Sequence, residues 1–277
     1  MPVSGRTRLF AVLGDPVTQV KAPALLNAEF ALLGADAVLV PVHAPAARLA
    51  EVVGGLKAAG NVDGLLVTVP HKLAVCAYAD ELSEAAALAG SANALRREPD
   101  GRWFADNFDG AGFVRGLAGS GHRVRGLRVF LAGAGGAGLA VAAALLSGGA
   151  EHVVVRDPDR ARVAALVDRL GARWPGRVTA APAARADTSV DPVVARGTDL
   201  AVNATPLGLR AGDPLPFAPR DLAPGTLVAD LVMEPHETPL LRAAAACGLG
   251  IHHGIHMLRC QIELYSHFFR LTATPGI

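Results

Sequence analysis

The chain is 277 residues long, and 51 % of its residues are hydrophobic while only 18 % are charged. This length and composition suit a folded protein of two ordinary domains and exclude a disordered chain. The net charge is +1 and no basic stripe is evident, which argues against a nucleic-acid partner.

The cysteines and the N-terminus bear on where the protein works. Cys76, Cys247 and Cys260 are too few and too dispersed for a disulfide framework or a thiolate metal site. The N-terminus lacks a basic segment followed by an apolar core and a cleavage site. No apolar run reaches the roughly 18–20 residues that span a bilayer. We therefore expect a cytoplasmic protein that does not bind a membrane.

Short apolar segments alternate with alanine-rich helical segments along the chain. The predicted strands lack apolar–polar alternation, which is typical of parallel strands covered on both faces. They are Leu9–Leu13, Val38–Val42, Gly64–Val69, Arg128–Ala132, His152–Val155, Asp199–Asn203 and Thr226–Asp230. The predicted helices are Pro23–Leu33, Ala46–Ala59, Glu81–Leu88, Gly136–Ser147, Asp159–Leu170 and Pro239–Cys247. This alternation predicts an α/β fold with parallel sheets.

One segment interrupts the alternation. Asn93–Arg97 and Arg102–Ala105 flank an Asp-Gly pair, which is a turn signal, so the pattern predicts a hairpin. A helix is expected to begin again at Gly110, where we place a domain boundary. The long amphipathic stretch Ile255–Leu271 is expected to be the last helix.

Gly133 to Gly138 has the Gly-x-Gly-x-x-Gly spacing of a dinucleotide-binding loop. The first glycine permits a tight turn, the second lets backbone N–H groups approach a pyrophosphate, and the third lets helix and strand pack closely. The N-terminus of the following helix adds unsatisfied N–H groups that favour an anion. A glycine-rich turn can also serve packing alone, but the strand–loop–helix context favours a dinucleotide.

The residues after the next strand bear on which dinucleotide binds. A carboxylate there binds a ribose 2′-hydroxyl, whereas an arginine favours a 2′-phosphate. Arg156 and Arg160 together favour a phosphate. Asp157 argues against a phosphate, unless it caps the helix that follows. On balance we expect NADP, with NAD as the alternative.

Lys72 and Asp109 each follow a short apolar run. Each has an ordinary explanation by position, as a solvated loop lysine and as a helix N-cap. A paired ammonium and carboxylate beside a nicotinamide site can move a proton while the cofactor moves a hydride. That combination suggests an alcohol or ketone oxidoreductase.

Three nearby histidines, His252, His253 and His256, raise the question of a metal. None is followed by a glutamate at metalloprotease spacing, and no thiolate cluster is near. We expect no metal, and interpret the segment as a strand end followed by a helix start.

Seven ordered segments resemble the motifs of the shikimate dehydrogenase family, over nearly the whole chain. They are Gly14–Pro16 with Lys21–Pro23, Val67–Lys72, Ser91–Leu95, Asp106–Gly110, Val202–Gly208, Glu237–Leu241 and Gly254–Gln261. The resemblance implies an N-terminal α/β substrate-binding catalytic domain, residues 1–109 plus 254–277. It also implies a Rossmann-like NAD(P)-binding domain, residues 110–253, with a cleft between the two and a role in aromatic amino acid biosynthesis.

The resemblance also implies roles for single residues. Lys72 and Asp109 would be the catalytic pair, and Asn93 and Gln261 would bind ring hydroxyls, with Thr68 nearby. The residues expected at the cofactor site are Gly133, Ala134, Gly135, Gly136, Ala137, Gly138, Arg156, Asp157, Arg160, Asn203, Ala204, Thr205, Leu231 and Gly254.

Five substrate-facing positions depart from the family. The serines that take the substrate carboxylate correspond to Val20 and Ala22, an asparagine to Leu66, a threonine to Phe108 and a tyrosine to Met233. Each hydrogen bond lost to a carboxylate costs roughly 1.5–3 kcal/mol. Shikimate should therefore be turned over poorly. A cyclitol or another hydroaromatic compound suits these five positions better than shikimate does.

The sequence hypothesis is an NAD(P)-dependent dehydrogenase acting as a monomer or a homodimer. It would transfer a hydride between the nicotinamide and a secondary hydroxyl or ketone of shikimate or a related small molecule. One alternative is a non-catalytic ligand-binding or regulatory homologue of the same fold. Another is an unrelated two-domain dinucleotide reductase, which explains the glycine loop but not Asp106–Gly110.

Overall fold

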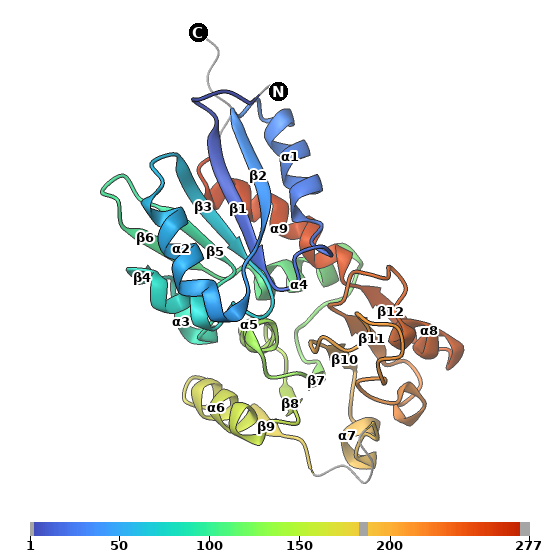
Figure 1. The fold of residues 1–277 in the computed structure, drawn as a ribbon. Coiled ribbons are helices and arrows are strands. Elements are labelled where there is room, and N and C mark those ends of the chain that lie inside the picture. The colour runs from blue at the N-terminus through green and yellow to red at the C-terminus, as the bar shows by residue number, and fades with distance from the viewer. Residues whose placement is uncertain (1–2, 183–187, 272–277) are drawn as a thin grey trace. The chain divides into compact units, whose positions relative to one another are not determined.

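A computed structural model describes residues 3–182 and 188–271 (Figure 1). The chain divides into two compact units: unit 1 is Met1–Asp109 with Arg259–Ile277, and unit 2 is Gly110–Leu258. The chain returns to unit 1 at Arg259, five residues later than the residue 254 that the resemblance implied, because His256 packs closely on Gly116 of unit 2. A Cβ on Gly116 would lie 3.1 Å from the carbonyl carbon of His256.

Unit 1 is built on a six-stranded sheet. Its strands are β1 (Arg8–Gly14), β2 (Ala37–His43), β3 (Val62–Val67), β4 (Glu81–Leu82), β5 (Ala94–Arg97) and β6 (Trp103–Asp106). Their order is β2-β1-β3-β5-β6-β4. The first three strands are parallel as predicted, but β5 is antiparallel to both β3 and β6. The predicted hairpin is therefore confirmed, and it makes this sheet mixed instead of all parallel.

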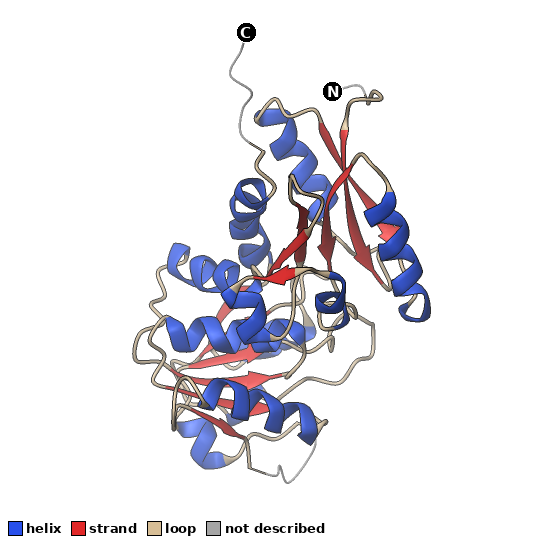
Figure 2. Ribbon diagram, turned by 90° about the vertical axis from the view of Figure 1, so that its left-hand side faces the viewer, coloured by secondary structure: helices blue, strands red, loops and turns tan. Residues whose placement is uncertain are grey.

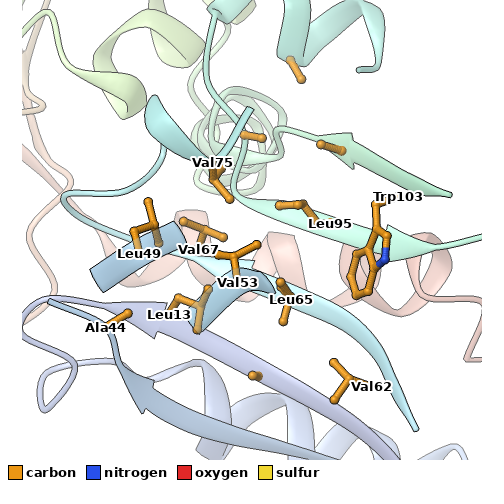
Figure 3. Close-up of a cluster of buried hydrophobic side chains, with 14 residues drawn as sticks. Leu13, Ala44, Leu49, Val53, Val62, Leu65, Val67, Val75, Leu95 and Trp103 are labelled. Atoms are coloured by element: carbon orange, nitrogen blue, oxygen red, sulfur yellow. The ribbon is translucent and has the colours of Figure 1, made fainter. Parts of the chain in front are cut away.

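Helices cover both faces of this sheet (Figure 2). They are α1 (Ala22–Leu32), α2 (Leu49–Ala58), α3 (Glu84–Ala89) and α9 (Ile255–Phe268), with the 3₁₀ turns η1 (Ala46–Arg48) and η2 (Ala74–Tyr78). Leu13 and Leu65 of the strands pack in one apolar cluster with Val53 of α2 (Figure 3). On the other face the Phe10 ring lies 5.7 Å from Phe30 of α1 and 4.7 Å from Phe269 after α9.

Two predicted helices of unit 1 were too long. Ala46–Ala59 is a 3₁₀ turn followed by α2, and the first residues of Glu81–Leu88 form β4. The reason at the second site is Ser83, whose side chain accepts from the N–H of Ala86 and starts α3 there. The residues before Ser83 pair with β6 instead.

Unit 2 contains a second six-stranded sheet, and all its strands are parallel. Its strands are β7 (Arg128–Ala132), β8 (His152–Arg156), β9 (Val178–Ala180), β10 (Leu200–Asn203), β11 (Leu227–Asp230) and β12 (Gly250–His253). Their order is β12-β11-β10-β7-β8-β9. Counted within the unit this is 3-2-1-4-5-6, the order of dinucleotide-binding Rossmann folds.

The helices of unit 2 are α4 (Asp109–Gly119), α5 (Gly136–Ser147), α6 (Arg160–Gly171), α7 (Pro192–Arg196) and α8 (Pro239–Ala246), with the 3₁₀ turn η3 (Pro219–Asp221). The alanine-rich α5 has eight buried residues, so it packs closely in the unit's core. Among the helices of the described residues, none is both long enough and apolar enough to span a bilayer.

Candidate active site

The strand directions of unit 1 bring Lys72 and Asp109 together. Since β5 is antiparallel to both β3 and β6, those two strands run the same way and end at the same edge of the sheet. Lys72 follows β3, and Asp109 follows β6 as the first residue of α4. Lys72 Nζ donates to Asp109 Oδ2 at 2.5 Å, and the two side chains are only 13 % and 2 % exposed.

Two amides complete the surroundings of the Asp109 carboxylate. Asn93 Nδ2 donates to Asp109 Oδ1 at 2.9 Å, and Gln261 Nε2 donates to the same oxygen at 3.1 Å. Both residues are buried. The carboxylate thus has three donors from three parts of the chain, and a buried charge with such partners is held in one orientation. The structure brings four predicted site residues into one network within unit 1.

Sequence reasoning missed a fifth member of this network, Tyr265. Its hydroxyl donates to Gln261 Oε1 at 3.2 Å and accepts from Asn93 Nδ2 at 3.0 Å. Burial and the charge of Asp109 raise the pKa of Tyr265 well above its usual range, so the hydroxyl keeps its proton. The available signal was its spacing, since Tyr265 is four residues after Gln261 on one helix face.

This network leaves Asn93 little capacity for a substrate hydroxyl. Both N–H groups of its amide are donated within the protein, and its Oδ1 accepts from the N–H of Phe108 at 2.9 Å. In this structure Asn93 therefore orients Asp109, whereas the sequence suggested a direct ligand of the substrate. Gln261 donates one N–H to Asp109 and accepts at its Oε1 from Tyr265.

The remaining predicted substrate residues lie in different places. Thr68 directly follows β3, and a Cβ on Gly14 would lie 2.6 Å from its methyl carbon. Val20 is half-buried just before α1, and Ala22 is the first residue of that helix. Met233 belongs to unit 2.

Two other departures from the family pattern, Leu66 and Phe108, are apolar residues of unit 1. Leu66 is buried in β3. The Phe108 ring lies edge-on to Tyr265, with centroids 5.5 Å apart, and to Phe268 at 5.2 Å. Phe108 therefore packs against the network through the ring of Tyr265.

The glycine loop of unit 2 fits a pyrophosphate group. Gly133 has φ +108, and a Cβ there would lie 2.7 Å from the carbonyl carbon of Ala204. A Cβ on Gly138 would lie 2.1 Å from the carbonyl oxygen of Gly133, so helix and loop pack as closely as backbone allows. A Cβ on Gly135, by contrast, would have no atom within 4 Å. Two glycines are thus needed for packing, and the one between them leaves open space for a ligand.

Other predicted cofactor residues lie at the carboxyl ends of neighbouring strands, which is where open α/β sheets bind ligands. A Cβ on Gly254 would lie 2.7 Å from the carbonyl oxygen of Leu231. Asn203 is fully buried, and its Oδ1 accepts from both the N–H and the hydroxyl of Thr205 at 3.0 and 2.7 Å. Asn203 therefore shapes the loop around Thr205 from inside the protein.

Asp230, at the end of β11, holds Asn203 in place at this edge of the sheet. It was not predicted from the sequence as a site residue. It accepts from Asn203 Nδ2 at 2.8 Å and from the hydroxyl of Thr238 at 2.6 Å. Burial raises its pKa to about 6 in spite of these bonds. Thr238 also caps α8 by accepting from the N–H of Leu241. A sequence signal existed, because threonine before proline is typical of a helix start.

The charged residues at the end of β8 and just after it are placed differently from one another. The guanidinium of Arg156 donates to the carbonyl oxygen of Ser189 at 2.6 Å and to that of Pro216, and it lies over the Phe130 ring. The Arg156 guanidinium thus binds carbonyl groups of the protein, whereas the sequence suggested that it binds a phosphate group of the cofactor. Arg160 is exposed at the first position of α6.

Asp157 is held beside the glycine loop. Its Oδ2 accepts from the N–H of Ala134 at 2.8 Å, and its Oδ1 accepts from the N–H of Asp159 at 2.9 Å. The N-cap of α6 is Asp159, which accepts from the N–H groups of Ala161 and Arg162. The capping explanation that the sequence allowed for Asp157 therefore applies to Asp159 instead.

The histidines pack with one another as rings. His252 and His253 end β12, and His256 lies in the first turn of α9, as the sequence suggested. The His252 and His256 rings stack at 4.9 Å, and His253 stacks on His236 at 4.5 Å. Burial lowers the pKa of His252 to about 4, which favours the neutral ring. Over residues 3–182 and 188–271, no group of three His, Cys, Asp or Glu side chains is arranged to hold a metal.

Comparisons with known proteins agree over most of the chain. A family profile described as the shikimate dehydrogenase substrate binding domain matches residues 12–95. Shikimate dehydrogenase (NADP(+)) of Rubrobacter xylanophilus is 41 % identical over 260 residues, which cover 94 % of this chain and 89 % of that protein.

Solved structures of similar proteins share the fold along nearly the whole chain. Shikimate 5-dehydrogenase from Thermus thermophilus, in complex with NADP(H) and shikimate, has a TM-score of 0.81 and 32 % identity, covering 95 % of this chain and 93 % of that one. The 5-ketofructose reductase of a Gluconobacter strain has a TM-score of 0.81 and 28 % identity, covering 96 % and 94 %. The chain belongs to the shikimate dehydrogenase family.

Proposed function

We propose that the protein is an NAD(P)-dependent dehydrogenase that interconverts a secondary alcohol and a ketone on a polyhydroxylated small molecule. The single observation that carries this proposal is the Lys72–Asp109 pair, at 2.5 Å and almost fully buried. The glycine loop of unit 2 supplies a fitting dinucleotide site, and the 41 % identical relative is named a shikimate dehydrogenase.

A nicotinamide held by unit 2 would supply the hydride donor or acceptor. In the direction of ketone reduction, the Lys72 ammonium donates a hydrogen bond and then a proton to the substrate oxygen. Asp109 keeps that ammonium in place, because its other oxygen is fixed by the amides of Asn93 and Gln261. In the direction of oxidation, the amine of Lys72 takes the hydroxyl proton back. The proposal requires the nicotinamide to reach a substrate bound by unit 1.

The substrate class follows from two residues at and just before the start of α1, Ala22 and Val20. Val20 and Ala22 carry no hydroxyl, so two donors that the family offers to a carboxylate are missing here. A carboxylate without donors loses roughly 1.5–3 kcal/mol for each absent bond. We therefore expect neutral polyhydroxylated substrates, such as a cyclitol or a ketosugar, to be preferred over shikimate. The likeness to a protein named 5-ketofructose reductase supports an uncharged ketone substrate.

We also place this activity in the cytoplasm, in a monomer or a homodimer acting on small molecules. A cytoplasmic site suits a reaction that depends on free nicotinamide dinucleotide. A gel-filtration profile of the purified protein decides between the two oligomeric states.

The test is turnover of the purified full-length protein, followed by the absorbance of the reduced nicotinamide. Shikimate, quinate, several cyclitols and several ketosugars are each offered with NAD(H) and with NADP(H). The proposal expects turnover of at least one neutral compound with a higher kcat/KM than shikimate. Ligand-induced quenching of protein fluorescence without any turnover would favour a binding protein and contradict the proposal. Efficient turnover of shikimate would contradict only the substrate class.

A further inference from the structure

The carboxyl end of β8 lies directly against the glycine loop. β7 and β8 are adjacent and parallel, with Ala132 opposite Arg156. The N–H of Gly133 donates to the carbonyl oxygen of Arg156 at 2.7 Å, and the N–H of Ala134 donates to Asp157 Oδ2 at 2.8 Å. The side chain after β8 is therefore fixed beside the loop that would hold the pyrophosphate, where the adenosine ribose of a dinucleotide lies in Rossmann folds.

The carboxylate of Asp157 still has capacity for a ligand. Each of its oxygens accepts one backbone N–H, and a carboxylate oxygen has room for about one more donor. A ribose 2′-hydroxyl is such a donor. A 2′-phosphate at the same place would bring two anionic groups into contact.

The cations that would offset that repulsion are poorly placed. Arg156 is tied to the carbonyl oxygens of Ser189 and Pro216, so its guanidinium is occupied away from the loop. Pro158, directly after the aspartate, has no polar side-chain atom. Arg162 pairs with Asp159 at 3.1 Å. Arg160 is the remaining cation of this segment, and it is exposed on α6.

We infer that Asp157 makes this protein select NAD over NADP. The inference rests on the proposed function, because it concerns the cofactor of that same reaction. It also separates this chain from its 41 % identical relative, whose name specifies NADP(+). Asp157 acts as a specificity-determining residue that touches the cofactor ribose.

The experiment measures binding, independently of turnover. NADH and NADPH are titrated into the purified full-length protein, and Kd is taken from reduced-nicotinamide fluorescence and from calorimetry. The unmodified protein should bind NADH at least about 10-fold more tightly, which is the value of one charge-assisted hydrogen bond.

Two variants distinguish the role of Asp157 from that of a nearby residue. Asp157→Asn keeps an oxygen for the N–H of Ala134 but removes the charge, so NADH should bind about 10-fold more weakly and NADPH more tightly. Arg162→Ala is the matched control, because Arg162 lies on the same segment and pairs with Asp159. Both of its Kd values should stay within about twofold of those of the unmodified protein, which is less than the effect of one hydrogen bond. Thermal unfolding of each variant reports whether the loop is intact.

Each other outcome is informative. Tighter binding of NADPH by the unmodified protein, with loss of that binding in Arg160→Ala, would overturn the inference and identify Arg160 as a phosphate ligand. Equal weakening of both cofactors in Asp157→Asn would overturn it too, because the residue would then only shape the loop. If neither dinucleotide bound the unmodified protein, the proposed function itself would fail.

Discussion

At the scale of single residues, the candidate site is a set of side chains that restrict one another. Asp109 receives donors from Lys72, Asn93 and Gln261, and Tyr265 joins the two amides. An amide whose donors and acceptor are all occupied cannot rotate without breaking several bonds. The position of the ammonium is thereby determined by groups that need not touch the substrate.

Tyr265→Phe tests this arrangement. The change removes one hydroxyl and leaves the Oε1 of Gln261 and one N–H of Asn93 without a partner. Unsatisfied buried groups cost roughly 1–3 kcal/mol, so the free energy of unfolding should fall by about that amount in urea titrations. The kcat should fall as well, with little change in KM, because Asp109 and Lys72 lose their fixed orientation.

The control is Tyr78→Phe, at the other tyrosine of the chain, which is half-buried in η2. Its effect on kcat should be small. An unchanged kcat in Tyr265→Phe would show that the tyrosine serves only packing.

At the scale of elements, the strand–loop–helix unit β7–loop–α5 carries the dinucleotide site. Its glycines have different tasks, because a Cβ would clash with backbone at Gly138 and would enter open space at Gly135. One substitution should therefore damage the fold, and the other should damage only the ligand site.

Gly138→Ala should lower the thermal midpoint of the protein, since backbone at 2.1 Å has to move to admit a methyl group. Gly135→Ala should keep the midpoint and lose dinucleotide affinity, because the methyl group fills space that the pyrophosphate needs. Differential scanning fluorimetry with and without dinucleotide measures both effects. The account of the loop is wrong if Gly135→Ala binds as tightly as the unmodified protein.

The elements also show how far the sequence can be interpreted. The bounds predicted for β7 and α5 agree with the structure, because apolar strand, glycine loop and alanine-rich helix are all strong local signals. β9 was missed, and β12 was predicted only as a strand end before the last helix, since each strand is short and carries polar or exposed residues. The pair Lys72–Asp109 was predicted from a family pattern, but its cause is the antiparallel β5, a tertiary fact that periodicity alone does not reveal.

Tyr265 and Asp230 illustrate the same limit at the site. Neither follows from a motif, because their importance comes from residues far away in sequence: Asn93 for Tyr265 and Asn203 for Asp230. The opposite error occurred at Arg156. Its sequence position suits a phosphate ligand, but two carbonyl groups bind its guanidinium.

At the scale of the whole molecule, the two units divide the chemistry. The residues of the proton-transfer network belong to unit 1, and the glycine loop, Asp157 and Asp230 belong to unit 2. The stability of unit 2 should depend on pH through two buried groups with shifted pKa values, His252 and Asp230.

His252 should make the protein less stable in mild acid. Its pKa is about 4 in the folded state against 6.5 for an ordinary histidine, so the unfolded chain binds the proton more readily. The contribution is fully present above pH 6.5 and is lost as the pH falls towards 4, by on the order of 2–3 kcal/mol. The ring faces His122, His253 and His256, which oppose a further positive charge.

Urea titrations from pH 8 to pH 4 check this for the unmodified protein and for His252→Gln. The variant should lose less stability over that interval than the unmodified protein does. Parallel pH curves for the two proteins would contradict the assignment.

Asp230 should act in the opposite direction. Its folded pKa of about 6 lies above the ordinary 3.8, so its stabilising neutral form is present at low pH and is lost as the pH rises through 6. Relative to the unmodified protein, Asp230→Asn should therefore gain stability between pH 4 and pH 7, by on the order of 3 kcal/mol. The same titrations measure it, and a relative loss over that range would refute the buried-acid explanation.

The central claim, that Lys72 transfers the proton of a secondary alcohol, is tested most directly by comparing Lys72→Met with the unmodified protein. Both are assayed on the best substrate of the panel and titrated with dinucleotide, and Lys57→Met in α2 serves as the control because it is outside the network. We expect kcat to fall by roughly 10²–10⁴-fold in Lys72→Met while the dinucleotide Kd stays nearly unchanged. A kcat within a few-fold of the unmodified protein would contradict the account.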